Sequence, residues 1–356
     1  MTLLQETPTT VFPWAGEHVA DRPAEARGSA RDDVRLLVAR PDGLTHRRFA
    51  DLAEELEPGD LVVVNNSATV AAQVDVLDGV GRVRVLHLAT PLDDGTWMVE
   101  LRTAPAAARA VLGARPGEVL TAVPLADERV TLELLAPYPR QGSSPTGSGN
   151  RLWRARVSGP LDRHVARHGR PIAYGYLDRA YPLEAYQSVF ATVPGSAEMP
   201  SAGRPFTADL ITRLVARGIS VAPVTLHTGV SSQEAGEAPQ VERYEVGEHT
   251  ARLVDATREA GHRVVAVGTT VTRALESAVH AGRVVPRRGW TDRVVTPRQP
   301  PQVVTGLVTG WHDPQASHLL LVEAVAGPGL AQRAYDEAVR ERYWWHEFGD
   351  AGLFLP

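Results

Sequence analysis

Three short segments of the chain place polar or aromatic side chains directly after an apolar run. Residues 268–277 (GTTVTRALES) begin at a glycine and continue with two threonines, residues 225–229 carry His227, and residues 309–314 carry His312. In α/β proteins, ligands bind beyond the carboxyl ends of the strands of the sheet. We therefore take these three segments as the candidate site.

The first segment has the pattern of an anion site at the start of a helix. Free backbone N–H groups and the helix dipole attract negative charge there, and the dipole contributes about 0.3–1 kcal/mol. The side chains that could contact such a ligand are Thr269, Thr270, Arg273 and Glu276, with Arg273 able to bind a carboxylate through two hydrogen bonds. The alternative is an ordinary helix start, with Glu276 paired to Arg273 on the helix surface.

The other two segments offer proton-transfer groups. A histidine at a strand end is a candidate general acid or base, which makes His227 and His312 the predicted catalytic residues. Trp311 precedes His312 and could stack on a flat base such as adenine or a deazaguanine. The alternatives are a loop histidine bonded to backbone for His227 and a packed turn for Trp311 and His312.

Several function classes lose their usual sequence support. The chain has no cysteine, which excludes disulfides, thiolate metal sites and cysteine nucleophiles. It has no HExxH, P-loop, GxGxxG or GxSxG motif, so metalloprotease, kinase, dehydrogenase and α/β-hydrolase interpretations are disfavoured, and we expect no metal. The start lacks a signal-peptide pattern and the apolar runs are too short to cross a bilayer. We expect a cytoplasmic protein without a membrane partner.

Charge leaves the question of a nucleic-acid partner open. The formal net charge is −5, which argues against tight, non-specific RNA binding. The stretch 151–170 is nevertheless rich in arginine, and it can form either a local basic face or an ordinary solvated surface.

The elements that position these residues follow two different patterns. With 356 residues, of which 43% are apolar, the chain is expected to form two domains. Alternation of Trp97, Val99 and Leu101 with other side chains, and a similar pattern at 130–135, predicts a small antiparallel barrel in the middle of the chain. Residues 139–150 read as a flexible loop.

The two outer parts of the chain alternate helix and strand, which predicts a parallel or mixed sheet with helices outside. A helix capped by Thr207 ends at Gly218. The other predicted strands are 36–39, 61–64, 219–226, 263–267 and 303–309, and the other predicted helices are 49–56, 250–260, 269–281, 316–326 and 330–345.

Taken together, these segments resemble the S-adenosylmethionine:tRNA ribosyltransferase-isomerase family of queuosine biosynthesis. The matching stretches are RDDVRLLV (31–38), THRRFADL (45–52), LEPGDLVVVN (56–65), YQSVFA (186–191), PSAG (200–203) with Phe206-Thr207, VTLHTG (224–229), GTT with R and LES (268–277), GLVT (306–309) with His312 and Pro314, parts of 334–343, and FGDA (348–351). The resemblance covers nearly the whole chain.

The resemblance implies a fold and a reaction. The fold would be an α/β main domain, a barrel-like mixed sheet with outer helices (1–68 plus 170–356), with an inserted small antiparallel β-barrel (69–169). The reaction would move the ribosyl part of S-adenosylmethionine, a cosubstrate, onto 7-aminomethyl-7-deazaguanine in tRNA. It would give epoxyqueuosine and release adenine and methionine. Tyr343 and Asp350 lie in the matching C-terminal stretch and join Trp311 as candidate cosubstrate contacts.

This chain also departs from the family pattern at substrate-facing loops. The family's Asp-Thr-Arg is replaced by residues 66–68 (NSA), its Leu-His by Arg204-Pro205, its Gly-Thr-Phe by residues in 230–233, and its Arg-Phe by Trp344-Trp345. Of its later His-Ser-Glu, only the acid remains, as Glu242. Two alternatives therefore stay open: a diverged paralogue that uses S-adenosylmethionine on a small-molecule acceptor, and a non-catalytic binding protein with the same fold.

Overall fold

A mixed nine-stranded sheet forms the centre of the main lobe. The computed structural model describes residues 4, 6–13, 16–124, 129–141, 147–230, 237–314 and 316–356. Within these, the sheet has the strand order β17-β13-β12-β3-β14-β18-β19-β1-β2. Its strands are β1 (Arg35–Arg40), β2 (Gly43–Arg48), β3 (Leu61–Asn65), β12 (Ser220–His227), β13 (Glu242–Val246), β14 (Val264–Val267), β17 (Arg287–Thr291), β18 (Gly306–Gly310) and β19 (Ala351–Phe354).

The four central strands are parallel neighbours. β12 pairs with β3, β3 with β14, and β14 with β18. Runs of branched apolar residues explain this position, because a strand covered on both faces is apolar over nearly its whole length. β3 reads LVVVN and β14 reads VVAV. The carboxyl ends of these four strands meet at one edge of the sheet.

Helices cover both faces of this sheet. On one face lie α3 (Glu248–Glu259), α4 (Thr269–Ser277), α5 (Ser317–Ala326) and α6 (Pro328–Arg340), whose apolar side chains form one core with the strands. On the other face lie α2 (Ala208–Ala216) and the 3₁₀ helix η3 (Phe49–Glu54), which build a second core. Thr207 caps α2 by accepting a hydrogen bond from the Leu210 N–H (3.2 Å).

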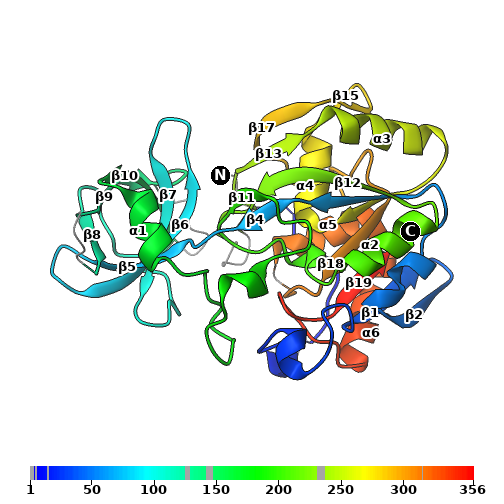
Figure 1. Cartoon of the computed structure of the whole chain (residues 1–356), viewed down its shortest axis with the longest axis horizontal. Helices are drawn as coiled ribbons and strands as arrows, with labels where there is room; N and C mark the ends of the chain where they lie inside the picture. Colours follow the sequence, from blue (N-terminus) through cyan, green and yellow to red (C-terminus); the bar gives the residue numbers. More distant parts are fainter. Residues whose placement is uncertain are drawn as a thin grey trace.

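A closed antiparallel β-barrel forms the second lobe, to the left of the sheet in Figure 1. Its strands are β5 (Gln73–Leu77), β6 (Val83–Pro91), β7 (Trp97–Thr103), β8 (Val119–Val123), β9 (Thr131–Pro137) and β10 (Leu152–Ser158), with α1 (Leu161–His168) packed against them. Closure leaves no strand edge open in the barrel. All six strands lie within 69–169, and the exact domain boundaries stay a prediction.

Shorter elements connect these units. They are β4 (Ser67–Thr69) paired with β11 (Val193–Ser196), β15 (Val279–His280) paired with β16 (Arg283–Val284), and the 3₁₀ turns η1 (Gly16–His18), η2 (Ala24–Arg27), η4 (Leu183–Tyr186) and η5 (Ser201–Gly203). The β4–β11 pair lies beside the end of β12, so it contributes to the edge where the predicted site residues meet.

The predicted fold class, an α/β main domain with an inserted antiparallel β-barrel, is confirmed. Three details differ. The large sheet runs open from β17 to β2 in the described residues, the helix expected at 49–56 is a 3₁₀ helix, and the last helix ends at Arg340 because Arg342 adopts a positive φ of 54°. The predicted loop 139–150 lies partly outside the described residues.

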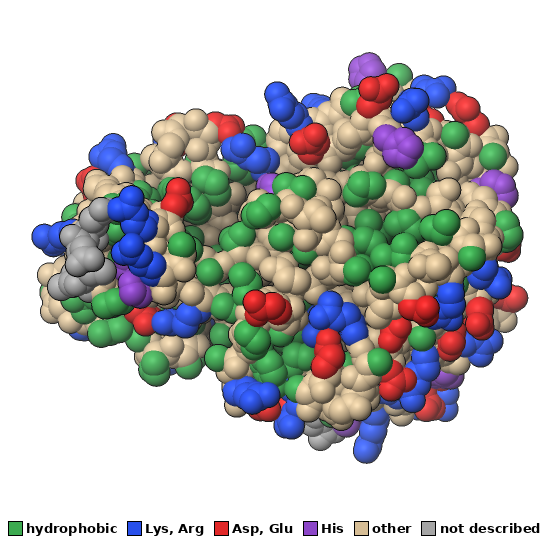
Figure 2. All heavy atoms as spheres, viewed as in Figure 1, with side chains coloured by type: hydrophobic (Ala, Val, Ile, Leu, Met, Phe, Trp, Pro, Cys, Tyr) green, Lys and Arg blue, Asp and Glu red, His purple; other side chains and the backbone are tan. Residues whose placement is uncertain are grey.

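Several arginines of the stretch 151–170 are paired with acidic side chains or buried. Arg156 and Arg170 pair with Glu133 (3.0 Å) and Asp75 (2.7 Å), and Arg151 is buried. On the side shown in Figure 2, basic and acidic side chains are interspersed over the main lobe.

Candidate functional site

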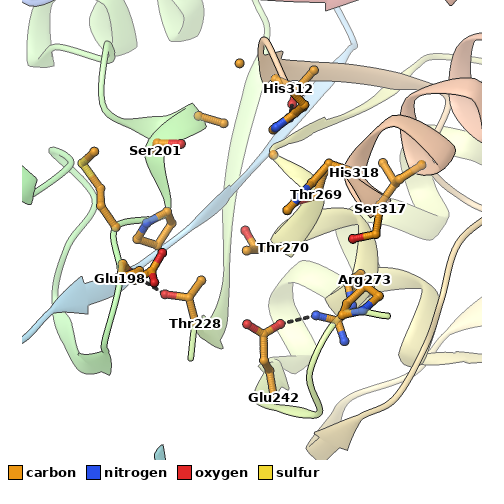
Figure 3. A pocket seen from close by; sticks show the side chains of 18 of the residues that line it. Glu198, Ser201, Thr228, Glu242, Thr269, Thr270, Arg273, His312, Ser317 and His318 are labelled. Atoms are coloured by element: carbon orange, nitrogen blue, oxygen red, sulfur yellow. Dashed lines mark hydrogen bonds and ion pairs between the residues drawn. The ribbon is translucent and has the colours of Figure 1, made fainter. Parts of the chain in front are cut away.

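A cavity opens at the carboxyl edge of the four parallel strands. The chain segments that follow β12, β14 and β18 line it, together with residues from η5, the start of α5 and the segment after α6. Its polar lining residues are Tyr174, Glu198, Ser201, Thr228, Gln240, Glu242, Thr269, Thr270, Arg273, Thr309, His312, Ser317, His318 and Glu347. Figure 3 shows the labelled side chains arranged around this space.

The start of α4 forms one wall of the cavity. Gly268 has φ 92° and ψ 163°, a conformation almost exclusive to glycine, and a Cβ at this position would lie 3.1 Å from the Ala202 side chain. This turn directs Thr269 and Thr270 into the cavity. The sequence prediction that these two threonines face a common ligand space therefore agrees with the geometry.

Arg273 lines the same wall, but its guanidinium already has protein partners. It forms an ion pair with Glu242, and it donates to the backbone oxygens of Arg293 (3.0 Å) and Gln240 (2.8 Å). Both side chains of the pair are largely buried, and burial raises the pKa of Glu242 although Arg273 opposes that shift. Arg273 is therefore a framework cation of the cavity rather than a free carboxylate clamp.

His312 lies in the cavity next to a second histidine, His318 at the start of α5. The two rings stack at 4.6 Å with an interplanar angle of 11°, and Nε2 of His312 is 2.9 Å from the Thr309 hydroxyl. Burial, together with His318 and His346, holds the pKa of His312 well below its usual value. Burial and Arg273 lower the pKa of His318 to about 4. Both imidazoles are therefore neutral at neutral pH.

His227 does not share this cavity. It ends β12 and lines a second cavity, located between β6–β7 of the barrel and the β13–β17 edge of the main sheet. Its Nδ1 is 2.7 Å from the Ser67 hydroxyl, and the chain at Gly195 passes so close to the ring that a Cβ there would lie 2.5 Å from Nδ1. Burial lowers the pKa of His227, and Arg243 adds to this shift. The two predicted catalytic histidines thus face different spaces.

Two predicted cosubstrate contacts of the strand-end segments, Glu276 and Trp311, do not line the cavity. Glu276 points away from the cavity, where its carboxylate accepts hydrogen bonds from the N–H groups of Gln302 (2.8 Å), Val303 (3.0 Å) and Val304 (3.1 Å). Trp311 is 1% exposed and packs edge-on against Tyr335 at 5.0 Å, so no base can stack on it. Both residues stabilise the loop and the core instead.

The two C-terminal candidates also lie away from the cavity. Asp350 is 4% exposed and binds Arg35, accepting from its backbone N–H (2.8 Å) and its Nε (3.0 Å). The Tyr343 hydroxyl is 2.8 Å from Nδ1 of His46, and the Arg35 guanidinium covers its ring at 4.1 Å. These contacts fasten the C-terminal segment to β1 and β2. Tyr343 and Asp350 do not line the strand-end cavity, and their role as cosubstrate contacts stays a prediction.

Several cavity residues were not predicted from the sequence. Glu198, Ser201, His318 and Glu347 belong to loops or a helix start without a strand-end glycine signal. Burial raises the pKa of Glu347 to about 7, and its Oε2 has no hydrogen-bond partner among the described residues. Two lining residues carried a signal: Glu242 keeps the acid of the family pattern, and Ser201 lies in the matching stretch 200–203.

The departures from the family pattern lie in different surroundings. Asn66 and Ser67 adjoin His227, and Asn66 accepts a hydrogen bond from the Thr225 hydroxyl (2.6 Å). Arg204 is 3% exposed, binds Glu25 (2.9 Å) and lies over the Phe348 ring, so it serves the core. Trp345 is fully buried and Trp344 partly exposed. Residues 231–233 lie outside the described part.

The described residues contain neither a metal-binding cluster nor a membrane-spanning helix. No group of three or more His, Asp or Glu side chains could hold a metal ion in the described part of the chain. No helix of this part is long and apolar enough to cross a membrane.

The fold and the site define an α/β protein with an inserted β-barrel and a ligand cavity at the strand ends, and known proteins share this plan. Residues 11–354 match the family described as queuosine biosynthesis protein. A crystal structure of an S-adenosylmethionine tRNA ribosyltransferase from Thermotoga maritima superposes with a TM-score of 0.52 at 28% identity, covering 97% of this chain and 99% of that one.

Curated relatives agree along the whole length. The S-adenosylmethionine:tRNA ribosyltransferase-isomerase of Acidiphilium cryptum is 36% identical over 348 residues, 95% of each chain. That of Heliobacterium modesticaldum is 33% identical over 355 residues, covering 95% of this chain and 96% of the relative. The chain belongs to the queuosine biosynthesis protein family.

Proposed function

We propose that this protein is an S-adenosylmethionine-dependent ribosyltransferase-isomerase. It transfers and isomerises the ribosyl moiety of S-adenosylmethionine onto 7-aminomethyl-7-deazaguanine in tRNA, giving epoxyqueuosine and releasing adenine and methionine. Support comes from membership of the family, whose relatives bear this name, and from the charge of the strand-end cavity.

The charge of the cavity is the observation that carries the proposal. Glu198, Glu242 and Glu347 line it. The charge of Glu242 is cancelled by Arg273, the single arginine among the described lining residues, so the negative charge of the cavity comes from Glu198 and from the ionised fraction of Glu347. S-adenosylmethionine carries a sulfonium and an ammonium group against one carboxylate, so its net charge is positive. An acidic, partly desolvated cavity is complementary to such a ligand. The N–H groups at the start of α4 remain available for its carboxylate.

Two residues of the cavity suit the required proton transfers. Neutral His312, oriented by Thr309, accepts the proton removed from the carbon next to the sulfonium. When the bond between ribose and adenine breaks, its electron pair goes to the adenine nitrogen. The Glu347 carboxyl then donates a proton to that nitrogen and becomes a carboxylate, which yields neutral adenine.

The acceptor side is assigned to the second cavity. His227 lies there with Asn66, Trp290 and the exposed Arg288, and Thr228, the residue after His227, already lines the cosubstrate cavity. Trp290 offers an aromatic surface for a base and Arg288 a cation for a phosphate. In this arrangement His312 serves the cosubstrate and His227 the incoming amine.

The decisive experiment follows adenine release from S-adenosylmethionine by the purified protein. With tRNA that carries the aminomethyl-deazaguanine, adenine should appear in step with epoxyqueuosine, and tRNA lacking this base should give none. A His227→Ala or Arg273→Ala variant should lose at least about 100-fold in turnover. Near-normal turnover in either variant would remove that residue from the mechanism.

A small-molecule acceptor is the second candidate. It is favoured by the net charge of −5 and by residues 66–68, which supply neither acid nor cation beside His227. Adenine release with the free deazaguanine base but not with tRNA would support it. A protein that binds neither S-adenosylmethionine nor tRNA in calorimetry would contradict both enzymatic functions. With tRNA as the acceptor, the cytoplasm is the expected location.

A further inference from the structure

A cluster of buried polar side chains lies on the outer face of the β-barrel, because the neighbouring residues Val99 and Leu101 fill the barrel core. Glu100 of β7 is 1% exposed and receives contacts from Arg102 (2.7 Å), Arg151 (3.1 Å) and His87 (3.6 Å). Burial alone would raise the pKa of Glu100, but His87 and the two arginines outweigh burial and lower it to about 2. Glu100 is therefore a carboxylate fixed between cations.

Arg151 connects this cluster to the main lobe. It stands just before β10 and is 5% exposed, and its second terminal nitrogen lies 2.8 Å from Oε1 of Glu237, which is also 5% exposed. Glu237 belongs to the segment 237–241 that leads into β13 of the main sheet. A buried charge without its partner is strongly unfavourable, so this pair determines where the segment lies against the barrel.

The same segment forms part of the cosubstrate cavity. Gln240 donates from Nε2 to Oε1 of Glu237 (2.9 Å), and its backbone oxygen accepts from Arg273 (2.8 Å). Arg273 in turn pairs with Glu242, which accepts from the Gly229 N–H (3.2 Å). Gln240, Glu242 and Arg273 all line the cavity. A continuous series of polar contacts thus runs from the outer face of the barrel to the cavity wall.

We propose that Arg151 is a positioning residue for the cosubstrate site, through which the inserted barrel holds the segment 237–242 in its binding geometry. This inference rests on the proposed function only in taking S-adenosylmethionine as the ligand of the strand-end cavity. The barrel is then part of the cosubstrate site even though none of its strands lines the cavity. Such coupling through a packed polar network requires direct measurement.

The test compares Arg151→Met and Glu237→Gln with a matched barrel control, Arg156→Met, whose side chain is exposed on β10 and pairs with Glu133. Calorimetry should show the Kd of S-adenosylmethionine raised about tenfold or more in both test variants and unchanged in the control. In turnover with tRNA, KM for S-adenosylmethionine should rise by the same factor while kcat changes less than about threefold. Arg151→Lys should restore part of the affinity.

Two further measurements distinguish a positioning role of Arg151 from a general loss of folding in the variants. The double variant Arg151→Met/Glu237→Gln should bind about as weakly as either single variant, because the two residues act through one contact. Glu237→Gln keeps the shape of the side chain. If Arg151→Met does not fold, this variant alone tests whether the Arg151–Glu237 pair positions the segment 237–242. Wild-type affinity in a folded Glu237→Gln protein would overturn the inference. If the wild-type protein itself binds no S-adenosylmethionine, the proposed function has failed instead.

Discussion

Arg273 and Glu242 form a buried ion pair that is part of the wall of the ligand cavity. Arg273 comes from α4 and Glu242 from the start of β13, and the remaining donors of Arg273 bind backbone oxygens of Arg293 and Gln240. One guanidinium therefore holds together three chain segments and supplies the only positive charge of an arginine among the described lining residues.

Removing one member of this pair should cost stability as well as activity. Arg273→Met leaves Glu242 buried without its partner, so the free energy of unfolding should fall by about 3–5 kcal/mol. The double variant Arg273→Met/Glu242→Gln should regain most of this loss, because no charge remains unpaired. Urea denaturation measures both values. Arg252→Met, on the exposed face of α3, is the control and should stay within about 0.5 kcal/mol of wild type. A double variant as unstable as the single one would contradict this account.

Gly268 should be intolerant of any side chain. Its φ of 92° with ψ 163° and the 3.1 Å approach of Ala202 predict that Gly268→Ala loses about 1–3 kcal/mol and displaces the start of α4. S-adenosylmethionine affinity, measured by calorimetry, should fall with it. Gly43→Ala in β2 has open space and no positive φ, so it should be nearly neutral. If Gly268→Ala and Gly43→Ala lost equal stability and affinity, the backbone conformation of Gly268 could not be the cause.

Part of the site was predictable from sequence because ligands of α/β proteins bind beyond the carboxyl ends of the strands. An apolar run followed by glycine marked Thr269, Thr270 and His312, and these residues line one cavity because parallel strands end at one edge of the sheet. It could not tell that Trp311, next to His312, turns into the core, since neighbouring residues in a turn need not face the same way.

Long-range packing decided the rest of the site. His318 and Glu347 reach the cavity through the packing of α5 and the segment after α6, and no local pattern marks such a contact. Glu276 was predicted as a cosubstrate contact, with a pair to Arg273 as the alternative, but its carboxylate accepts hydrogen bonds from the loop N–H groups at 302–304. The Arg151–Glu237 pair joins the two lobes, and no local sequence pattern predicts this contact either.

The pH dependence of turnover should depend on Glu347. The titratable groups that line the same cavity are Tyr174, Glu198, Glu242, Arg273, His312 and His318. A general acid must be protonated, so kcat should decline as the pH rises through about 7, the pKa to which burial raises Glu347. Glu347→Gln should lower kcat by about 100-fold or more and abolish this decline. A variant with wild-type rates would remove Glu347 as the proton donor.

Stability should show the same titration with a defined sign. The pKa of Glu347 is raised from 4.5 to about 7 on folding, so the folded protein binds the proton more tightly than the unfolded chain. The stabilisation is fully present below pH 4.5 and is lost as the pH rises through about 7. Glu347→Gln should flatten the free energy of unfolding over this window, whereas Glu341→Gln, a partly exposed control, should not. A wild-type curve without this decline would contradict the assignment.

The second cavity should contribute to tRNA binding through Arg288. This side chain is exposed beside Trp290 and His227, in a position to neutralise a phosphate of a single-stranded loop. Each such contact accounts for a slope of about −0.7 in a plot of log affinity against log salt. Arg288→Ala should therefore weaken tRNA binding and make this slope shallower by about 0.7, measured by fluorescence anisotropy from 50 to 200 mM salt. Arg333→Ala, exposed on α6, should leave both unchanged. Arg288→Ala could keep the wild-type salt slope while the protein still releases adenine with tRNA. The tRNA would then bind without contacting Arg288, and the proposal that the second cavity holds the acceptor would be wrong.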